Sequence, residues 1–69
     1  MQPAAKVRVI GPVGSGQLDK IGVVMSSARA GDVYPHTKLN PDLEIVTVAL
    51  DDEGGKVRNF KRSDLEELP

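Results

Sequence analysis

The sequence predicts an all-β protein with one small domain, and three observations support this prediction. The chain has 69 residues, a length that allows a single small core. It contains 9 Val, 3 Ile and 2 Thr, β-branched residues that favour strands, but only one Tyr and one Phe. Its 7 glycines and 5 prolines divide the chain into short segments. We therefore expect several short strands separated by turns.

Alternation of charged and branched apolar residues predicts the first strand at residues 6–10. In such a strand Val7 and Val9 face a core, while the charged residues between them face water. Residues 1–5 are expected to be a flexible N-terminus. Residues 11–16 combine three glycines with a proline and predict a loop, because proline lacks a donor and glycine is costly to order.

A second strand is predicted at residues 20–25. Ile21 and Val23 share one face of this strand, and Gly22 indicates either a bulge or a close approach of another backbone. From residue 26 to residue 42 the alternation stops and small polar residues, glycine and proline dominate. Irregular stretches of this length are uncommon in small domains and are often functional or disordered. We expect a long loop that is either a selectivity element or a tolerated insertion.

The longest strand is predicted at residues 43–50, with Val46, Val48 and Leu50 directed inward. Ile45 lies on the opposite face of this strand and leaves its register open. Residues 51–55 form a polar hairpin loop whose two glycines can adopt positive φ. The segment that follows, residues 56–60, is then the antiparallel partner strand.

The C-terminal segment predicts one helical turn. Ser63 and Glu66 have the spacing of a capping box, in which each side chain bonds the backbone amide of the other residue. This turn would direct Leu65 and Leu68 to the core.

Four to five short antiparallel strands must curl in order to bury one face. The simplest closure is a small SH3-like barrel over residues 6–69, with a long loop at 26–42 and a C-terminal helical turn. No apolar run approaches the roughly 18 residues of a membrane span, and the start of the chain lacks a signal-peptide pattern. Cysteine is absent, which is compatible with a reducing compartment. We expect a cytoplasmic protein without membrane insertion. The sequence does not predict its oligomeric state.

No motif that carries chemistry is complete. Residues 11–16 have the spacing of half a phosphate-binding loop, but Gln17 and Leu18 stand where Lys and Ser or Thr are required. His36 is the only histidine and cannot form a multi-histidine metal site. The acidic residues at 51–53 lack the spacing of a calcium loop. We expect no enzymatic activity, no cofactor and no metal.

The best functional feature is a local basic patch. The net charge of −1 excludes a strongly basic nucleic-acid binder. Four of the seven residues at 56–62 are nevertheless basic, and two cations of the first strand would join them if the strands are neighbours. The predicted partner-binding residues are Lys6, Arg8, Lys56, Arg58, Lys61 and Arg62. Such a patch suits an acidic protein partner or a short nucleic-acid contact, and its alternative is a solvated strand face that limits edge aggregation.

Four segments carry a resemblance to known proteins: residues 6–9 (Lys-Val-Arg-Val), 21–24 (Ile-Gly-Val-Val), 46–51 (Val-Thr-Val-Ala-Leu-Asp) and 59–66, which includes Asn59-Phe60 and Asp64-Leu65-Glu66. In these segments the chain resembles a group of small SH3-like barrels, namely the SH3-like subunits of photosystem I and of the photosynthetic NDH complex and the variable chain of ferredoxin–thioredoxin reductase. The resemblance implies a non-catalytic protein that docks an acidic electron carrier or helps to assemble a larger complex.

Two further resemblances concern the activity. The valines and glycines between Val7 and Val24 are similar to a loosely spaced KOW motif, which implies the alternative of a module that binds RNA, DNA or a transcription or translation complex. The shape also resembles the type II dihydrofolate reductase, whose Val-Gln-Ile-Tyr strand would fall at residues 57–60. The chain lacks Gln and Tyr there, so we do not expect that activity.

Overall fold

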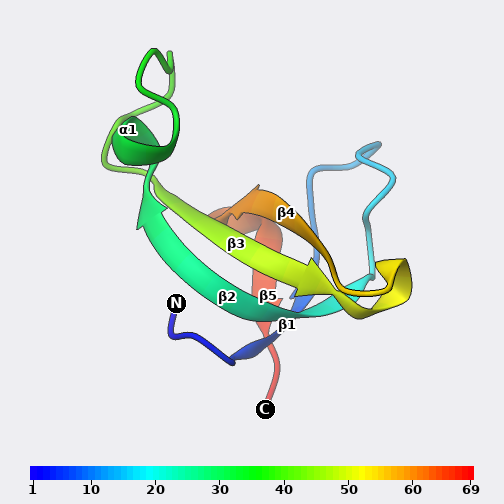
Figure 1. Ribbon diagram of the computed structural model, residues 1–69. Coiled ribbons are helices and arrows are strands. Elements are labelled where there is room, and N and C mark those ends of the chain that lie inside the picture. The colour runs from blue at the N-terminus through cyan, green and yellow to red at the C-terminus, as the bar shows by residue number, and fades with distance from the viewer.

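The computed structural model describes residues 1–69 and consists mainly of one antiparallel sheet (Figure 1). The strands are joined in the order β4-β3-β2-β1-β5, and every neighbouring pair is antiparallel. This confirms the all-β prediction as a five-stranded antiparallel sheet. The elements in chain order are β1 (Lys6–Val9), β2 (Ile21–Arg29), α1 (Ala30–Val33), β3 (Glu44–Leu50), the 3-10 turn η1 (Asp51–Glu53), β4 (Lys56–Lys61), the 3-10 turn η2 (Arg62–Asp64) and β5 (Leu65–Glu67).

The core receives side chains from all five strands, which requires the sheet to curl around them. Burial of these apolar side chains is the main stabilising contribution in so small a domain. The inward positions predicted for β1 and β3 are confirmed, and Phe60 fills the core from β4. The buried cluster is Val7, Val9, Val24, Val46, Val48, Leu50, Phe60 and Leu65.

In β2, the side chain that reaches this cluster is Val24. Ile21 and Val23 do share one face, as predicted, but that face is only half-buried. Gly22 marks a close backbone approach, because a Cβ atom there would lie 2.6 Å from the carbonyl oxygen of Ala49. A bulge is also present, but it falls between Val24 and Ser26 rather than at the glycine.

The long loop predicted at residues 26–42 is shorter in the structure. β2 continues to Arg29 and is followed by the one-turn helix α1, so the irregular segment covers residues 34–43 only. The added part of β2 pairs with β3 from Ser26↔Thr47 to Arg29↔Glu44. Its side chains are exposed on both faces, so backbone pairing and polar side-chain bonds such as that from Ser27 to Glu44 hold this part of the strand, and no hydrophobic alternation reveals it. α1 and the irregular segment 34–43 lie beyond the ends of these two strands and form a projecting lobe (Figure 1).

The hairpin between β3 and β4 is confirmed. Gly54 and Gly55 have φ values of 65° and 84°, in the left-handed region that favours glycine. The amide of Gly54 donates to the carbonyl of Asp51 over 3.2 Å, and the amide of Gly55 donates to that of Leu50 over 2.9 Å. The paired bonds close the η1 turn in the manner of a helix C-terminal cap.

The predicted C-terminal helical turn is present only as the 3-10 turn η2, which ends at Asp64, and the predicted capping box does not form. Ser63 lies within η2, which has no side-chain cap, and the chain then continues as β5. Leu65 enters the core as expected, but from a strand that pairs with β1 in the register Val9↔Leu65. Pairing gives partners to backbone groups along β1 that a helical turn would leave open. Leu68 is half-buried, and its amide donates to the carbonyl of Lys6 over 2.8 Å.

The segment before β1 lies against β2. The amide of Ala4 donates to the carbonyl of Val24 over 2.8 Å, and the amide of Val24 donates to the carbonyl of Ala5 over 2.9 Å. Met1 packs against the core cluster, and its α-amino group forms an ion pair with Glu44. None of the helices could span a membrane, and the longest of them, α1, has four residues.

Candidate functional site

The structure divides the predicted basic patch into separate groups. β4 is an edge strand, whereas β1 lies between β2 and β5, so two strands separate Lys6 and Arg8 from the cations of β4. The basic run on β4 is itself divided between two faces. Arg58 lies opposite Val48, on the core side of the sheet, and Lys61 lies opposite Ile45, on the other side.

Arg8 and Arg62 are occupied by partners within the chain. The Nη2 atom of Arg8 donates to Oε2 of Glu66 over 2.9 Å, directly across the β1–β5 pair. This hydrogen bond, together with the negative charge of Glu66, raises the pKa of Arg8 above its ordinary value. Arg62 donates from Nη1 to the carbonyl oxygen of Leu65 over 3.0 Å. Lys6 is exposed and forms no ion pair.

Arg58 belongs to a charged cluster beside the hairpin. Its Nε and Nη2 atoms donate to the two carboxylate oxygens of Glu53, over 2.6 Å and 3.2 Å. Lys20 adds a second cation 3.6 Å from Glu53 Oε2. The hydrogen bonds from Arg58, followed by the charges of Arg58 and Lys20, lower the pKa of Glu53. Only 16% of the Glu53 side chain is exposed, so the cluster anchors η1 to β4 and to the start of β2.

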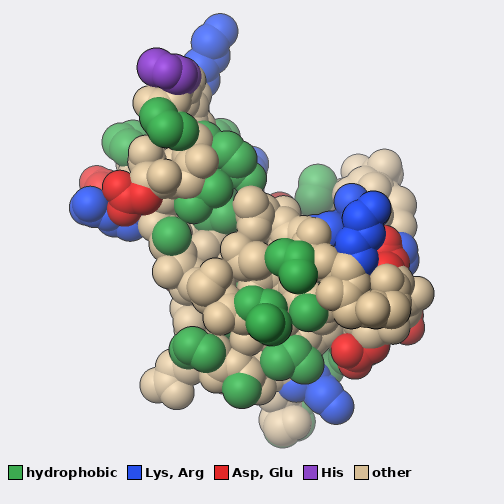
Figure 2. Space-filling view, in the orientation of Figure 1, with side chains coloured by type: hydrophobic (Ala, Val, Ile, Leu, Met, Phe, Trp, Pro, Cys, Tyr) green, Lys and Arg blue, Asp and Glu red, His purple; other side chains and the backbone are tan.

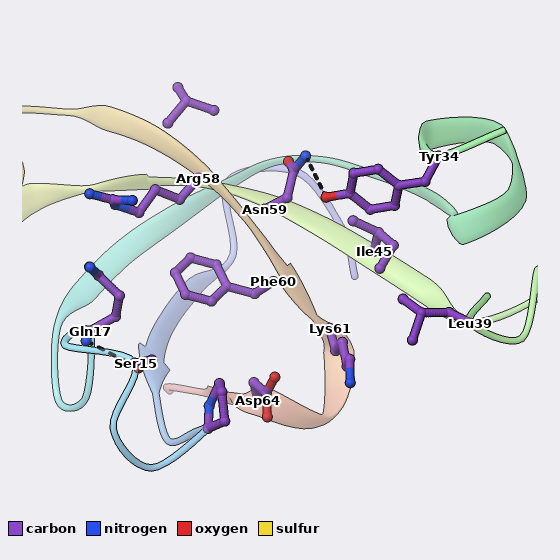
Figure 3. A pocket seen from close by; sticks show the side chains of 12 residues that line it. Ser15, Gln17, Tyr34, Leu39, Ile45, Arg58, Asn59, Phe60, Lys61 and Asp64 are labelled. Carbon is purple, nitrogen blue, oxygen red and sulfur yellow. Dashed lines mark hydrogen bonds between the residues drawn. The ribbon is translucent and has the colours of Figure 1, made fainter. Parts of the chain in front are cut away.

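An open groove of ≈ 690 Å³ runs along β4 (Figure 3). Five consecutive residues of β4, 57–61, line it, and they include two of the predicted cations. The other walls come from the loop that precedes β2, from η2 and from the projecting lobe. The lining residues are Pro12, Ser15, Gln17, Tyr34, Leu39, Ile45, Val57, Arg58, Asn59, Phe60, Lys61 and Asp64.

One wall of the groove is built from β3 and the lobe. Ile45 is 3% exposed and lies on the face of β3 away from the core, so both faces of this strand are covered there. Asn59 accepts a hydrogen bond from Thr47 Oγ1 at its Oδ1 atom, over 2.7 Å. Its amide nitrogen is thereby directed to Tyr34, to whose hydroxyl oxygen it donates over 3.3 Å (Figure 3). Tyr34 therefore stands at the groove with its ring partly exposed.

The opposite wall is the loop between β1 and β2. The hydroxyl oxygen of Ser15 accepts a hydrogen bond from the backbone amide of Gln17 over 3.1 Å. Gln17 also holds a buried side-chain oxygen that has no hydrogen-bond partner. Asp64 is the one acidic residue that lines the groove. Its Oδ1 atom lies 2.8 Å from the position that a Cβ atom on Gly11 would occupy. Figure 2, in the orientation of Figure 1, shows that the surface is hollowed between the lobe and the side of the molecule that carries the loop between β1 and β2.

The groove also presents exposed apolar side chains, which the sequence analysis did not predict as partner-binding residues. Tyr34, Leu39 and Val57 are all partly exposed there, Val57 to 53%. Tyr34 and Leu39 lie in the segment that the sequence suggested for selectivity. The only signal for them was a large apolar side chain within an otherwise polar loop. No group of three or more His, Cys, Asp or Glu side chains is placed to hold a metal ion.

Comparison with known proteins assigns no family to the chain. It matches no protein-family model, and neither a curated protein nor a solved structure matches it significantly.

Proposed function

We propose that this protein is a non-catalytic docking or assembly module that binds an acidic segment of a protein partner in the groove along β4. The observation that carries the proposal is the charge of β4, which has two lysines outside any ion pair and no acidic residue, and whose residues 57–61 form the floor of the groove. Lys56 and Lys61, at the two ends of the strand, form no ion pair within the chain.

The groove combines two contributions to binding. The free ammonium groups of Lys61, in the groove, and of Lys56, at the start of the same strand, attract an acidic segment and accelerate its encounter with the protein. The exposed faces of Tyr34, Leu39 and Val57 supply apolar area that a bound segment would cover. Charge therefore selects the partner, and the apolar wall adds affinity.

Two expectations from the sequence are part of the same proposal. The first is that the curled five-stranded sheet is a small SH3-like barrel, which is the architecture of the docking proteins that the sequence resembles. The absence of cysteine suits a module that works in the cytoplasm. Nucleic-acid binding is less favoured, because Arg8, Arg58 and Arg62 are engaged within the chain and few cations remain for phosphates.

The test uses a capped peptide, Glu-Thr-Val-Thr-Val-Glu, titrated into the labelled protein and followed by NMR. We expect binding at low salt that weakens as salt increases. The double variant Lys56→Glu/Lys61→Glu should bind about tenfold more weakly, since two attractions become repulsions. The control Lys6→Glu/Lys38→Glu changes the net charge equally at exposed positions outside β4, and it should bind like the unmodified protein.

Three results would contradict docking of an acidic segment. The peptide fails to bind at low salt, the two double variants lose affinity equally, or a single-stranded oligonucleotide binds more tightly than the peptide. The last result would favour the nucleic-acid alternative.

A further inference from the structure

The groove follows a strand edge whose backbone has no partner. β4 has six residues and pairs only with β3. No amide or carbonyl of Lys56–Lys61 is bonded to any loop or to the other edge strand, β5. Alternate residues of a strand direct both their N–H and C=O groups to the same side. Three residues of β4 therefore offer these groups to the free edge.

The lining of the groove shows that this edge is accessible. Arg58 and Phe60 lie on the core side of β4, opposite Val48 and Val46. Asn59 points to the other side, toward Tyr34 (Figure 3). Side chains from both faces of β4 therefore line the same groove. Successive side chains of a strand point to opposite faces, so a hollow that touches both sets follows the edge rather than a face.

The charges of β4 disfavour pairing of this edge with the β4 edge of a second copy of the chain. β4 carries Lys56, Arg58 and Lys61 and no acidic residue. Antiparallel pairing of two such strands would bring like charges together, which destabilises a sheet and is one way in which proteins protect their edges. The other edge strand, β5, has only three residues, two of them glutamates. The β4 edge is thus the longer one, and it favours an occupant of opposite charge.

We infer that an extended acidic segment of a partner binds as a sixth strand on the free edge of β4. This inference rests on the proposed docking function and specifies its geometry. A segment of about six residues would match the length of β4 and lie about 4.8 Å from it. Acidic side chains at its ends would face Lys56 and Lys61, and apolar side chains would cover Val57 and the lobe. The main-chain bonds supply affinity, while the side-chain positions supply selectivity.

The test uses two N-methylated forms of the peptide Glu-Thr-Val-Thr-Val-Glu. One form is methylated on the amides of its odd residues and the other on those of its even residues, so each loses the donors of one edge. A peptide that binds as a strand uses one edge only. We expect one form to bind about a hundredfold more weakly than the parent peptide, through the loss of three hydrogen bonds, and the other form to bind within about twofold.

A second measurement examines the protein. On addition of the parent peptide, amide exchange should slow at alternate residues of β4, which are either Lys56, Arg58 and Phe60 or Val57, Asn59 and Lys61.

The outcomes separate this geometry from the docking function. If the parent peptide binds but both methylated forms bind equally well or equally poorly, strand addition is overturned and docking stands. If slowed exchange is absent from β4, strand addition is again overturned. If the parent peptide does not bind, both proposals fail.

Discussion

Replacement of Gly22 by alanine tests how closely β2 and β3 approach. The new Cβ would lie 2.6 Å from the carbonyl oxygen of Ala49 and 2.6 Å from Cγ1 of Val48, whereas Cβ atoms in proteins keep at least 3.0 Å. The neighbouring backbone is part of β3, in the middle of the sheet, and it can move only if the strand pairing is disturbed. Overpacking of this kind costs about 3 kcal/mol.

Part of this cost is offset in the unfolded chain. Alanine is less flexible than glycine there, which stabilises the folded state by up to about 1 kcal/mol. We therefore expect Gly22→Ala to lower the free energy of unfolding by about 2 kcal/mol. At about 4–8 °C per kcal/mol for a domain of this size, the melting temperature should decrease by about 8–16 °C. Urea unfolding and thermal melts followed by circular dichroism measure both values.

The matched control is Gly31→Ala, in α1. A Cβ at this position would lie 3.0 Å from Cβ of Pro41, which belongs to an exposed loop that can adjust. Alanine is also favoured over glycine in a helix, so the control should remain within about 1 kcal/mol of the unmodified protein. Equal stability of Gly22→Ala and the unmodified protein would refute the close approach of the two strands.

Three further substitutions probe the core, the charged cluster and the lobe. Val48→Ala removes two methyl groups from a fully buried position and should cost about 2 kcal/mol in urea unfolding. The lowered pKa of Glu53 means that its ion pair stabilises the fold above the ordinary pKa of 4.5 and is lost as the pH falls through the lower folded-state pKa. Glu53→Gln should therefore destabilise the protein at neutral pH and flatten the decrease of stability in acid; an unchanged acid dependence would contradict this. Tyr34→Phe removes one exposed hydrogen bond and should cost less than about 0.5 kcal/mol in the same assay, whereas a large loss would make Tyr34 a structural residue.

The sequence predicted the strands that bury one face. Val7 and Val9 alternate with charged residues in β1, and Val46, Val48 and Leu50 alternate with outward residues in β3. Their burial is what creates the alternation, so the pattern and the strand have the same cause. Gly54 and Gly55 likewise predicted the hairpin, since their positive φ values are a local requirement.

The sequence failed where strand pairing, rather than a buried apolar face, determines the structure. Ser27 and Ala28 are exposed on a ribbon of two strands, and nothing in their side chains distinguishes them from loop residues. At the C-terminus, Ser63 and Glu66 fit a local capping motif. The distant strand β1 provides more backbone hydrogen bonds than that motif, so a strand forms instead.

The candidate site was predicted only in part. Lys61 lines the groove as a free cation, but the sequence could not show that Arg58 is engaged by Glu53. It also could not place Ser15 and Tyr34 on opposite walls of one groove, because their arrangement arises from the order of the strands. Side-chain identity thus indicated the charge of the site, and topology determined its shape.

The pairing of β1 with β5 has a consequence for the order of folding. β2, β3 and β4 follow one another along the chain, so each pairing closes a shorter segment than the join between β1 and β5, which brings Leu65 to Val9, 56 positions earlier. Closing a longer loop costs more chain entropy and slows folding. We therefore expect the hairpin of β3 and β4 to form first and the two ends of the chain to join last. Transient opening should begin at β5, where it would uncover Val7 and Val9 before the remainder of the sheet separates.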